Sequence, residues 1–364
     1  MDTESLDMDW KALMAYLPSD LEASAREHSF VQRSTGRQNA QSWLRLILMH
    51  AAGGLSLSQT VARAKAHGWA RVSAVALHKR LGRAGPWLES LTSHLLVSQR
   101  EALSALPALK GRVLRIVDAT DIQEPGATGT DWRLHYSLRL PHMVCDHFEL
   151  TDARGAEQFA RFTFHPGDAV LADRGYCHRP GVAYVLNAHA DVVVRLVPSN
   201  FPLQDDLARR FDALGKCRGL KTGEQREWRV WFEHGGWMYP LRLCVLRKPD
   251  EAVKEARRKL RQKASRKGTV LRTQTLEAAA YVMILTSLPH EDWSTSQVLD
   301  LYRCRWQIEL AFKRLKTLLQ AGHVPKSSDP TAKAWMQAKI LTALLIETLL
   351  CDSRSFSPYS SRLG

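Results

Sequence analysis

The amino-acid sequence predicts an α/β protein whose mixed β-sheet, with helices on its faces, follows a helical N-terminal region. Three observations support this fold class. Residues 39–104 repeat apolar side chains at helical spacing, residues 111–197 alternate strand-like and helix-like segments, and residues 198–290 add a further hairpin and a basic segment. We therefore expect a mixed-sheet core with a β-rich insertion, preceded by an N-terminal helical domain.

The helical region has the pattern of a helix-turn-helix. Three helices are predicted, at Ala40–Ala51, Ser58–His67 and Ser73–Arg83. The second begins at Ser58, a residue type that caps helices, and Gly68 lies in the turn that follows it. The third helix is basic, and its Lys79 and Arg80 are candidate contacts to DNA. A helical bundle with a solvated basic face is the alternative.

The segment after Gly111 has the pattern of a mixed sheet. Strands are predicted at Arg112–Thr120, Trp132–Leu140, Met143–Thr151, Ala169–Ala172 and Asp191–Val197. Short helices are predicted at Gly155–Phe162 and Pro180–Ala190. Three strands, a helix, a strand, a helix and a strand, in that order, describe a mixed sheet with helices on its faces.

The insertion combines strands with a basic arm. Its strands are predicted at Arg226–Glu233, Met238–Arg247 and Tyr281–Thr286, the first two forming a hairpin around Gly235-Gly236. The arm, Lys254–Lys267, holds eight Lys and Arg and only Leu260 as a large apolar residue, so we expect no core helix there. It is either a phosphate clamp or a solvated face. The basic residues singled out for DNA contact are Lys254, Arg257, Arg258 and Arg261.

The overall charge is strongly positive. The 364 residues include 51 Lys and Arg against 37 Asp and Glu, a formal net charge of +14. This balance favours a polyanionic partner, chiefly nucleic acid, over a basic soluble protein without one.

Cysteine usage and hydropathy exclude other classes. The six cysteines are scattered without a Cys-x-x-Cys pair, which argues against a zinc site or a disulfide framework and fits a reducing cytoplasm. No apolar run reaches 18 residues, so we expect no membrane span. Residues 1–9 are acidic and have no signal-peptide pattern, which favours a cytoplasmic protein.

Two acidic residues follow short apolar strands. Asp118 ends the run that starts at Val113, and Asp173 ends the strand Ala169–Ala172. Because functional sites of α/β sheets gather at the carboxyl ends of strands, both carboxylates lie where a sheet presents ligands. An acid that merely starts a loop is the alternative. Asp121 is a rival to Asp118, but it does not directly follow the apolar run.

A third acid, Glu309, lies on a predicted helix at Val298–Leu319. On an ideal helix Tyr302, Arg305, Glu309 and Lys316 point within roughly 60° of one another. Apolar residues, among them Ile308 and Phe312, occupy the opposite flank and would hold the helix against the sheet. One face therefore carries a phenol, a guanidinium, a carboxylate and an ammonium group.

These motifs resemble the insertion sequence four family of bacterial cut-and-paste DDE transposases. The helix resembles the signature Tyr302-x2-Arg305-x3-Glu309-x6-Lys316, with Trp306 directly after the arginine. The strand ends resemble the other two motifs, Asp118-Ala119-Thr120 and Asp173-Arg174-Gly175-Tyr176. The match runs from about Val113 to Leu350, and the long step between the second and third acids houses the family's β-rich insertion.

The resemblance implies an RNase H-like catalytic core in which Asp118, Asp173 and Glu309 are both the catalytic residues and the metal ligands. Two Mg²⁺ ions roughly 4 Å apart would serve the attacking and the leaving oxygen, and Mn²⁺ would substitute for them. Asp118 would bridge the ions, and Asp173 and Glu309 would each hold one.

The resemblance also implies contacts to DNA around that site. Arg305 would form a bidentate pair with a phosphate, Lys316 would supply a point charge and Tyr302 a hydroxyl. Arg174 and Tyr176 would contact DNA from the other side. Trp306 or Tyr281 would receive a flipped base, although a core role is the alternative for both.

The implied function is metal-dependent excision and strand transfer of an insertion sequence. The partners would be double-stranded DNA, namely terminal inverted repeats and target DNA, bound by a homodimer near the bacterial nucleoid in the cytoplasm. The alternatives are an RNase H-like nuclease or resolvase, a decayed transposase that only binds DNA, and a basic metabolic enzyme. The last is disfavoured because no Gly-rich nucleotide motif is present.

These assignments set the domain boundaries. We expect a helical DNA-binding domain at residues 1–108 and the first part of the catalytic core at residues 109–197. The β-rich insertion with its basic arm follows at residues 198–290. The helical completion of the core, with Glu309, occupies residues 291–352, and a polar tail occupies residues 353–364.

Overall fold

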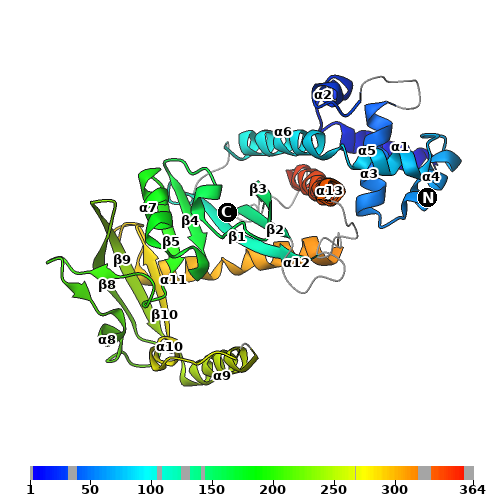
Figure 1. Cartoon of the computed structure of the whole chain (residues 1–364). Helices are drawn as coiled ribbons and strands as arrows, with labels where there is room; N and C mark the ends of the chain where they lie inside the picture. The colour runs from blue at the N-terminus through cyan, green and yellow to red at the C-terminus, as the bar shows by residue number, and fades with distance from the viewer. Residues whose placement is uncertain are drawn as a thin grey trace.

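The protein is elongated, with helices at one end, a large twisted sheet in the middle and a hairpin and a basic helix at the other end (Figure 1). The computed structural model describes residues 3–31, 39–104, 109–123, 132–140, 144–266, 268–318 and 329–355. The polar tail predicted from residue 353 lies mostly outside the described residues. None of the described helices is long and apolar enough to cross a membrane.

Five strands form the half of the sheet that carries the predicted acids. In spatial order they are β3 (Val144–Asp152), β2 (Trp132–Leu140), β1 (Val113–Ile122), β4 (Asp168–Ala172) and β5 (Asp191–Arg195). β4 runs parallel to both β1 and β5, whereas β1, β2 and β3 are antiparallel. All five residues of β4 are buried, as expected for a central parallel strand. This arrangement is the predicted RNase H-like mixed sheet.

The insertion continues the same sheet and does not form a separate layer. The added strands are β10 (Tyr281–Thr286), β9 (Trp237–Arg247), β8 (Gln225–His234), β6 (Leu203–Gln204) and β7 (Arg210–Phe211). β10 pairs antiparallel with β5 and so joins the two halves. Gly235 and Gly236 both have positive φ, the backbone that a tight β8–β9 hairpin turn requires. The three strands predicted for the insertion are therefore confirmed.

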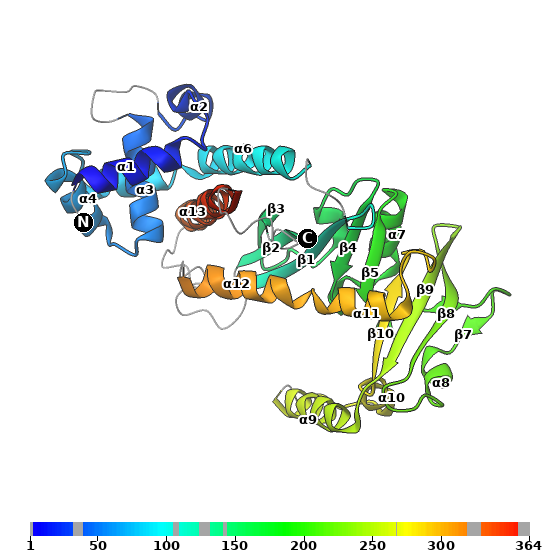
Figure 2. The same ribbon diagram turned by 180° about the vertical axis from the view of Figure 1, so that it is seen from behind.

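Helices cover both faces of the sheet. On one face α7 (Arg179–Asn187) packs Val182 and Val185 into a core with Val117 and Val170. On the other face α11 (Thr295–Arg303) and α12 (Trp306–Leu318) run across the sheet, as the rear view shows (Figure 2). There Phe312 of α12 packs against Tyr136 of β2, with the ring centroids 5.8 Å apart.

Two helix predictions need correction. The segment Gly155–Phe162 is not a helix; only Phe159–Arg161 forms a short 3-10 turn, η1. The helix predicted at Val298–Leu319 is divided between α11 and α12. Cys304 and Arg305 donate their N–H groups to carbonyls three residues back, so the helix tightens there before it resumes at Trp306.

The helical end contains α1 (Thr3–Met14), α2 (Leu21–Glu27), α3 (Ala40–Ala52), α4 (Leu57–Ala66), α5 (Ala74–Leu81) and α6 (Gly85–Ser104). The three predicted helices are confirmed. The cap of α4, however, is Ser56 and not Ser58: Ser56 and Gln59 form a reciprocal capping box, which satisfies two backbone donors at once.

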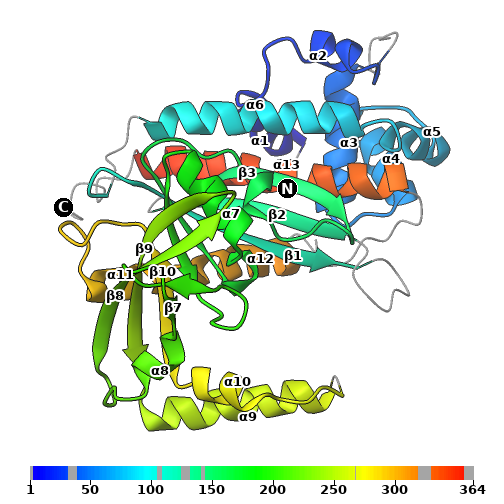
Figure 3. The same ribbon diagram turned by 60° about the vertical axis from the view of Figure 1, so that its left-hand side comes forward.

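The last described helix, α13 (Asp329–Ser355), closes the helical end. It lies alongside α6 and also contacts α3 (Figure 3). Its Trp335, Leu341 and Leu344 are buried in one hydrophobic core with residues of α3, α6 and the sheet. The N-terminal helices are therefore packed against the C-terminal part of the chain, which the predicted boundary at residue 108 does not anticipate.

Candidate active site

Asp118 and Asp173 lie side by side where β4 ends, although β1 itself continues past Asp118 to Ile122. The last register pair of parallel strands β1 and β4 joins Val117 to Ala172, and one acid follows each of these residues. Asp173 caps the short 3-10 turn η2 (Arg174–Tyr176) and accepts a hydrogen bond of 2.5 Å from the Gly175 N–H. The pairing of two parallel strands thus places two carboxylates at one edge.

Arg305 brings the third acid to the same place. Its Nη1 lies 3.3 Å from Asp118 Oδ2, and its Nη2 forms an ion pair with Glu309 Oε1. Glu309 follows Arg305 by one helical turn on α12, whereas Asp118 belongs to β1. A single guanidinium therefore joins the strand that carries the first acid to the helix that carries the third.

Negative charge accumulates around Asp118. Burial raises the pKa of Asp118 to about 7; the Ala119 N–H and Arg305 oppose that shift, and Asp173 and Glu157 add to it. Among the described residues no three acidic, His or Cys side chains converge closely enough to hold one ion as they stand. The Arg305 guanidinium supplies positive charge between Asp118 and Glu309 in this conformation.

Glu157 is a site residue that the sequence analysis missed. It lies in the loop between β3 and η1, half-buried, and a Cβ atom on Gly175 would collide with its carboxylate. Burial raises the pKa of Glu157, and the charge of Asp173 raises it further. No spacing signal could reveal it, because only the folded loop brings residue 157 to the second acidic motif.

Tyr176 differs from its predicted role as a DNA contact. Its ring is fully buried, with centroids 5.1 Å from Phe159 and 6.5 Å from Phe162. The hydroxyl is also buried and has no hydrogen-bond partner among the described residues. Burial raises its pKa, as do the charges of the carboxylates at Asp118, Glu157 and Asp173. Tyr176 therefore faces the acids from inside the protein, where DNA does not reach it.

The rival ligand Asp121 has a different partner. It stands directly opposite Arg133 on β2, and the two form an ion pair of 3.0 Å. Three residues separate it from Asp118, so the two side chains start on opposite faces of β1.

The remaining residues of the predicted helix signature differ in their distance from Arg305 and in their burial. Tyr302 lies against the hydrophobic core, and burial raises its pKa to about 12 while the nearby Arg305 opposes that shift. Trp306 is 51% exposed directly beside Arg305. Lys316 is half-buried farther along α12. Tyr281, the other candidate for a flipped base, is buried at the start of β10.

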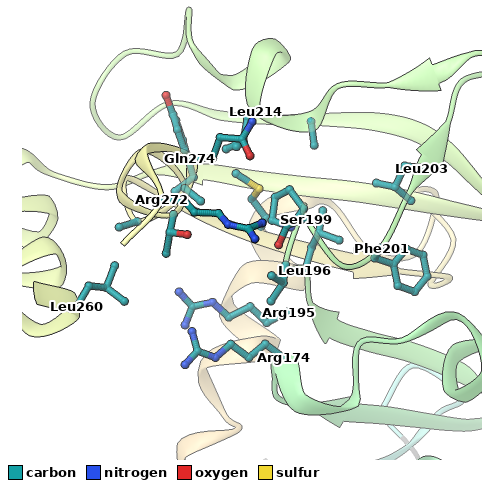
Figure 4. A pocket seen from close by; sticks show the side chains of 18 of the residues that line it. Arg174, Arg195, Leu196, Ser199, Phe201, Leu203, Leu214, Leu260, Arg272 and Gln274 are labelled. Atoms are coloured by element: carbon teal, nitrogen blue, oxygen red, sulfur yellow. The ribbon is translucent and has the colours of Figure 1, made fainter. Parts of the chain in front are cut away.

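A large basic cavity opens from Asp173 toward the insertion. Its volume is about 1190 Å³, and it lies between the ends of β5 and β10, α9 (Asp250–Arg266) and α10 (Thr273–Ala278). Figure 4 shows Arg174 and Arg195 side by side at its base. Burial lowers the pKa of Lys248 to about 8, and Arg195 lowers it further. The basic lining residues are Arg174, Arg195, Arg210, Lys248, Lys259, Lys263 and Arg272.

The predicted basic arm is the ordered helix α9. Its narrow apolar stripe consists of Val253, Ala256, Leu260 and Ala264, of which only Leu260 was noted in the sequence. The lysines of α9 that line the cavity are Lys259 and Lys263, which the sequence analysis did not single out.

The four predicted arm residues point elsewhere. Arg257 donates to the Leu276 carbonyl at 3.0 Å and thereby ties α9 to α10. Lys254 and Arg258 form ion pairs with acids of their own helix, at 2.8 Å and 2.7 Å. Arg261 is exposed.

The two residues of α5 that were predicted to contact DNA, Lys79 and Arg80, differ in their surroundings. Lys79 is exposed. Arg80 turns inward, donates to the Phe30 carbonyl and lies 5.4 Å from the centre of the Trp43 ring. Arg80 therefore fixes α5 against its neighbours.

Comparison with known proteins identifies the family. The profile described as "Transposase DDE domain" matches residues 109–345, and the chain therefore belongs to the DDE transposases. Over 97% of both chains it is 38% identical to the putative transposase InsL for insertion sequence element IS186A of Escherichia coli (strain K12). Over the same shares it is 37% identical to the transposase for insertion sequence element IS421 of Escherichia coli.

More distant matches follow. The transposase for insertion sequence element IS231C of Bacillus thuringiensis subsp. berliner is 23% identical over 93% of this chain and 77% of its own. A piggyBac transposase in a synaptic complex with hairpin DNA has a TM-score of 0.49 at 8% identity, covering 95% of this chain and 76% of its own.

The chain is thus the transposase of an insertion sequence, an enzyme that cleaves DNA and transfers strands. Membership of this family implies dependence on divalent metal ions. The similarity to insertion-sequence transposases along nearly the whole chain decides against a resolvase or a metabolic enzyme.

Proposed function

We propose that this transposase excises and inserts its element by cut-and-paste, with Asp118, Asp173 and Glu309 holding two Mg²⁺ ions for which Mn²⁺ substitutes. The observation that carries the proposal is the position of Arg305, within 3.3 Å of Asp118 and in an ion pair with Glu309, next to the last residue pair between β1 and β4. Three motifs that lie far apart in the sequence thereby share one site.

The residues fit such ions in their chemistry. Carboxylate oxygens are the ligands that Mg²⁺ prefers, and the Tyr176 hydroxyl is a buried polar group without a protein partner that faces the same carboxylates. The bound ions would activate the attacking oxygen and stabilise the leaving oxygen of the scissile phosphate. The chain's own part is to hold the acids at one edge and to balance their charge with Arg305.

Arg305 has a second task in this proposal. Its planar guanidinium matches a phosphate as well as it matches a carboxylate, so it holds the terminal phosphate of the transposon end when DNA is present. Tyr302 supports the guanidinium from the core side, exposed Trp306 offers a ring to a terminal base, and Lys316 adds positive charge farther along α12.

The basic cavity receives the DNA backbone next to the acids. Arg174 and Arg195 stand at its base near Asp173, while Lys259 and Lys263 enter from α9. A strand that lies in the cavity would have cations on both sides, and it would lead to Asp173, which lines the same cavity. We therefore assign the insertion to binding of the transposon end.

The helical end and the assembly complete the proposal. α4 and α5, with exposed Lys79, bind the terminal inverted repeat, and α13 fixes this unit to the core. A homodimer holds two paired ends and then the target DNA, close to the bacterial nucleoid.

Cleavage of a duplex that carries the element's own terminal repeat tests this function. We expect nicking at the repeat boundary in Mg²⁺, its loss on addition of a chelator and its recovery on addition of Mn²⁺. Repeat binding with no cleavage in either ion would instead indicate a decayed transposase that acts only as a DNA-binding protein.

The role of the cavity gives a separate prediction. The double variant Lys259→Gln/Lys263→Gln should bind repeat DNA more weakly, because two phosphate contacts are lost. The slope of log K against log salt should fall by about 1.8, roughly 0.9 for each contact.

The matched control is Lys254→Gln/Arg258→Gln, which removes the same charge from α9 residues that do not line the cavity. Its salt slope should stay closer to that of the wild type. Equal slopes for the two double variants would show that the cavity does not hold the backbone.

A further inference from the structure

The carboxylate of Glu157 is built into the second acidic motif. Gly175 lies in η2 between Arg174 and Tyr176, and its φ is not in the left-handed region. The glycine is therefore not needed for backbone conformation. A Cβ atom on residue 175 would collide with Glu157 Oε2, so a side chain here would force the Glu157 carboxylate to move away. The lack of a side chain at residue 175 therefore allows the Glu157 carboxylate to approach the second acidic motif.

The buried hydroxyl of Tyr176 lies near the same carboxylates. Tyr176 is fully buried, its hydroxyl has no hydrogen-bond partner among the described residues, and its electrostatic neighbours include Asp118, Glu157 and Asp173. An unpaired buried hydroxyl costs free energy, so its persistence here points to a partner bound at the carboxylates. A bound water or a hydrated ion would provide that partner.

The charge balance supports a fourth acid. Asp118, Asp173 and Glu309 do not neutralise two divalent ions, and Arg305 adds a further positive charge beside them. Glu157 lies within electrostatic range of Asp118 and Asp173, and Arg133 is the basic residue that opposes the rise in its pKa. Like-charged carboxylates gathered at one edge are stabilised by a cation between them.

We infer that Glu157 is a fourth carboxylate ligand of the divalent-cation site, next to Asp118 and Asp173, and that the glycine at position 175 leaves room for its carboxylate. The inference rests on the proposed function, since it assigns a further residue to the same metal site. It adds a donor from the β3–η1 loop to those from β1, β4 and α12.

Titration of the full-length protein with Mn²⁺, followed by electron paramagnetic resonance of the free ion and without DNA, tests this inference. Glu157→Gln keeps the shape of the side chain and should weaken Mn²⁺ binding by about tenfold or more. The matched control is Glu149→Gln, the same change on β3, where Glu149 pairs with Arg161 at 2.9 Å; it should bind as the wild type does.

A second variant tests the geometry without removing a charge. Gly175→Ala should displace the Glu157 carboxylate and weaken Mn²⁺ binding, but it should have no further effect in a Glu157→Gln background. Circular dichroism of each variant shows that it is folded.

Asp118→Asn separates the inference from the proposed function. If Asp118→Asn weakens Mn²⁺ binding while Glu157→Gln does not, the inference about Glu157 is wrong and the proposed metal site stands. If the wild type binds no Mn²⁺, or Asp118→Asn binds as the wild type does, both fail.

Discussion

Asp118→Asn is expected to slow cleavage at the terminal repeat by at least about 10³-fold, because ligands of catalytic ions support several kcal/mol of transition-state stabilisation. Asparagine keeps the size of the side chain but not its charge. Binding of the repeat should persist, since α4 and α5 lie at the helical end of the molecule, away from β1 (Figure 1). Single-turnover cleavage beside a gel-shift assay separates the two effects.

Asp121→Asn is the control for this prediction. It makes the same change three residues further along β1, where the carboxylate pairs with Arg133 and is more than half exposed. Its cleavage rate should stay within a few-fold of the wild type. A larger loss for Asp121→Asn than for Asp118→Asn would reverse the choice between these two acids.

Arg115→Met is expected to lower the free energy of unfolding by about 3–5 kcal/mol, because it leaves buried carboxylates without their partner. Arg115 lies on β1, three residues before Asp118, and is 4% exposed. Its Nε lies 2.9 Å from Asp146 Oδ2, and its Nη1 lies 3.1 Å from Asp168 Oδ2. The network joins β1 to β3 and β4, so it supports both strands that position the proposed catalytic acids.

Denaturant unfolding followed by circular dichroism measures this loss. Arg112→Met is the matched control, because Arg112 pairs with Asp191 at 2.6 Å in a partly exposed setting. Such a pair contributes less, about 1 kcal/mol or below. Equally small losses for both variants would mean that the buried network does not support the strands.

Much of the catalytic sheet could be predicted because its strands carry strong local signals. β1 and β4 each contain a short apolar run with an acid directly after it; the run marks the end of β4, whereas β1 continues past Asp118 to Ile122. The hairpin between β8 and β9 is marked by Gly235-Gly236. Signals of this kind involve only residues that are close in the sequence, so they can be recognised without knowledge of the tertiary structure.

The features that escaped prediction depend on contacts between distant segments. Glu157 joins the acids only because its loop folds over Gly175, and Tyr176 is removed from the surface by Phe159 and Phe162. The orientation of α9 follows from its own apolar stripe, in which Val253 and Ala264 are buried, and not from its charges.

The helical segment with the third acid was predicted correctly in one respect and incorrectly in another. Its predicted polar face assumed a regular helix, whereas the tight turn at Cys304 and Arg305 divides it. The pairing of Arg305 with Glu309 nevertheless lies within one helical turn and is present. The contact with Asp118 spans most of the catalytic core and could be expected only from the resemblance to the transposase family.

The most direct test of the central claim compares the wild type with Glu309→Ala in Mg²⁺-dependent nicking of a duplex that carries the element's terminal repeat. The claim is that an acid on α12 works with one acid within β1 and one that directly follows β4. It predicts cleavage at the repeat boundary by the wild type and none by Glu309→Ala, with equal binding of the repeat by both. Equal cleavage by the two proteins would contradict it and would show that a different carboxylate completes the site.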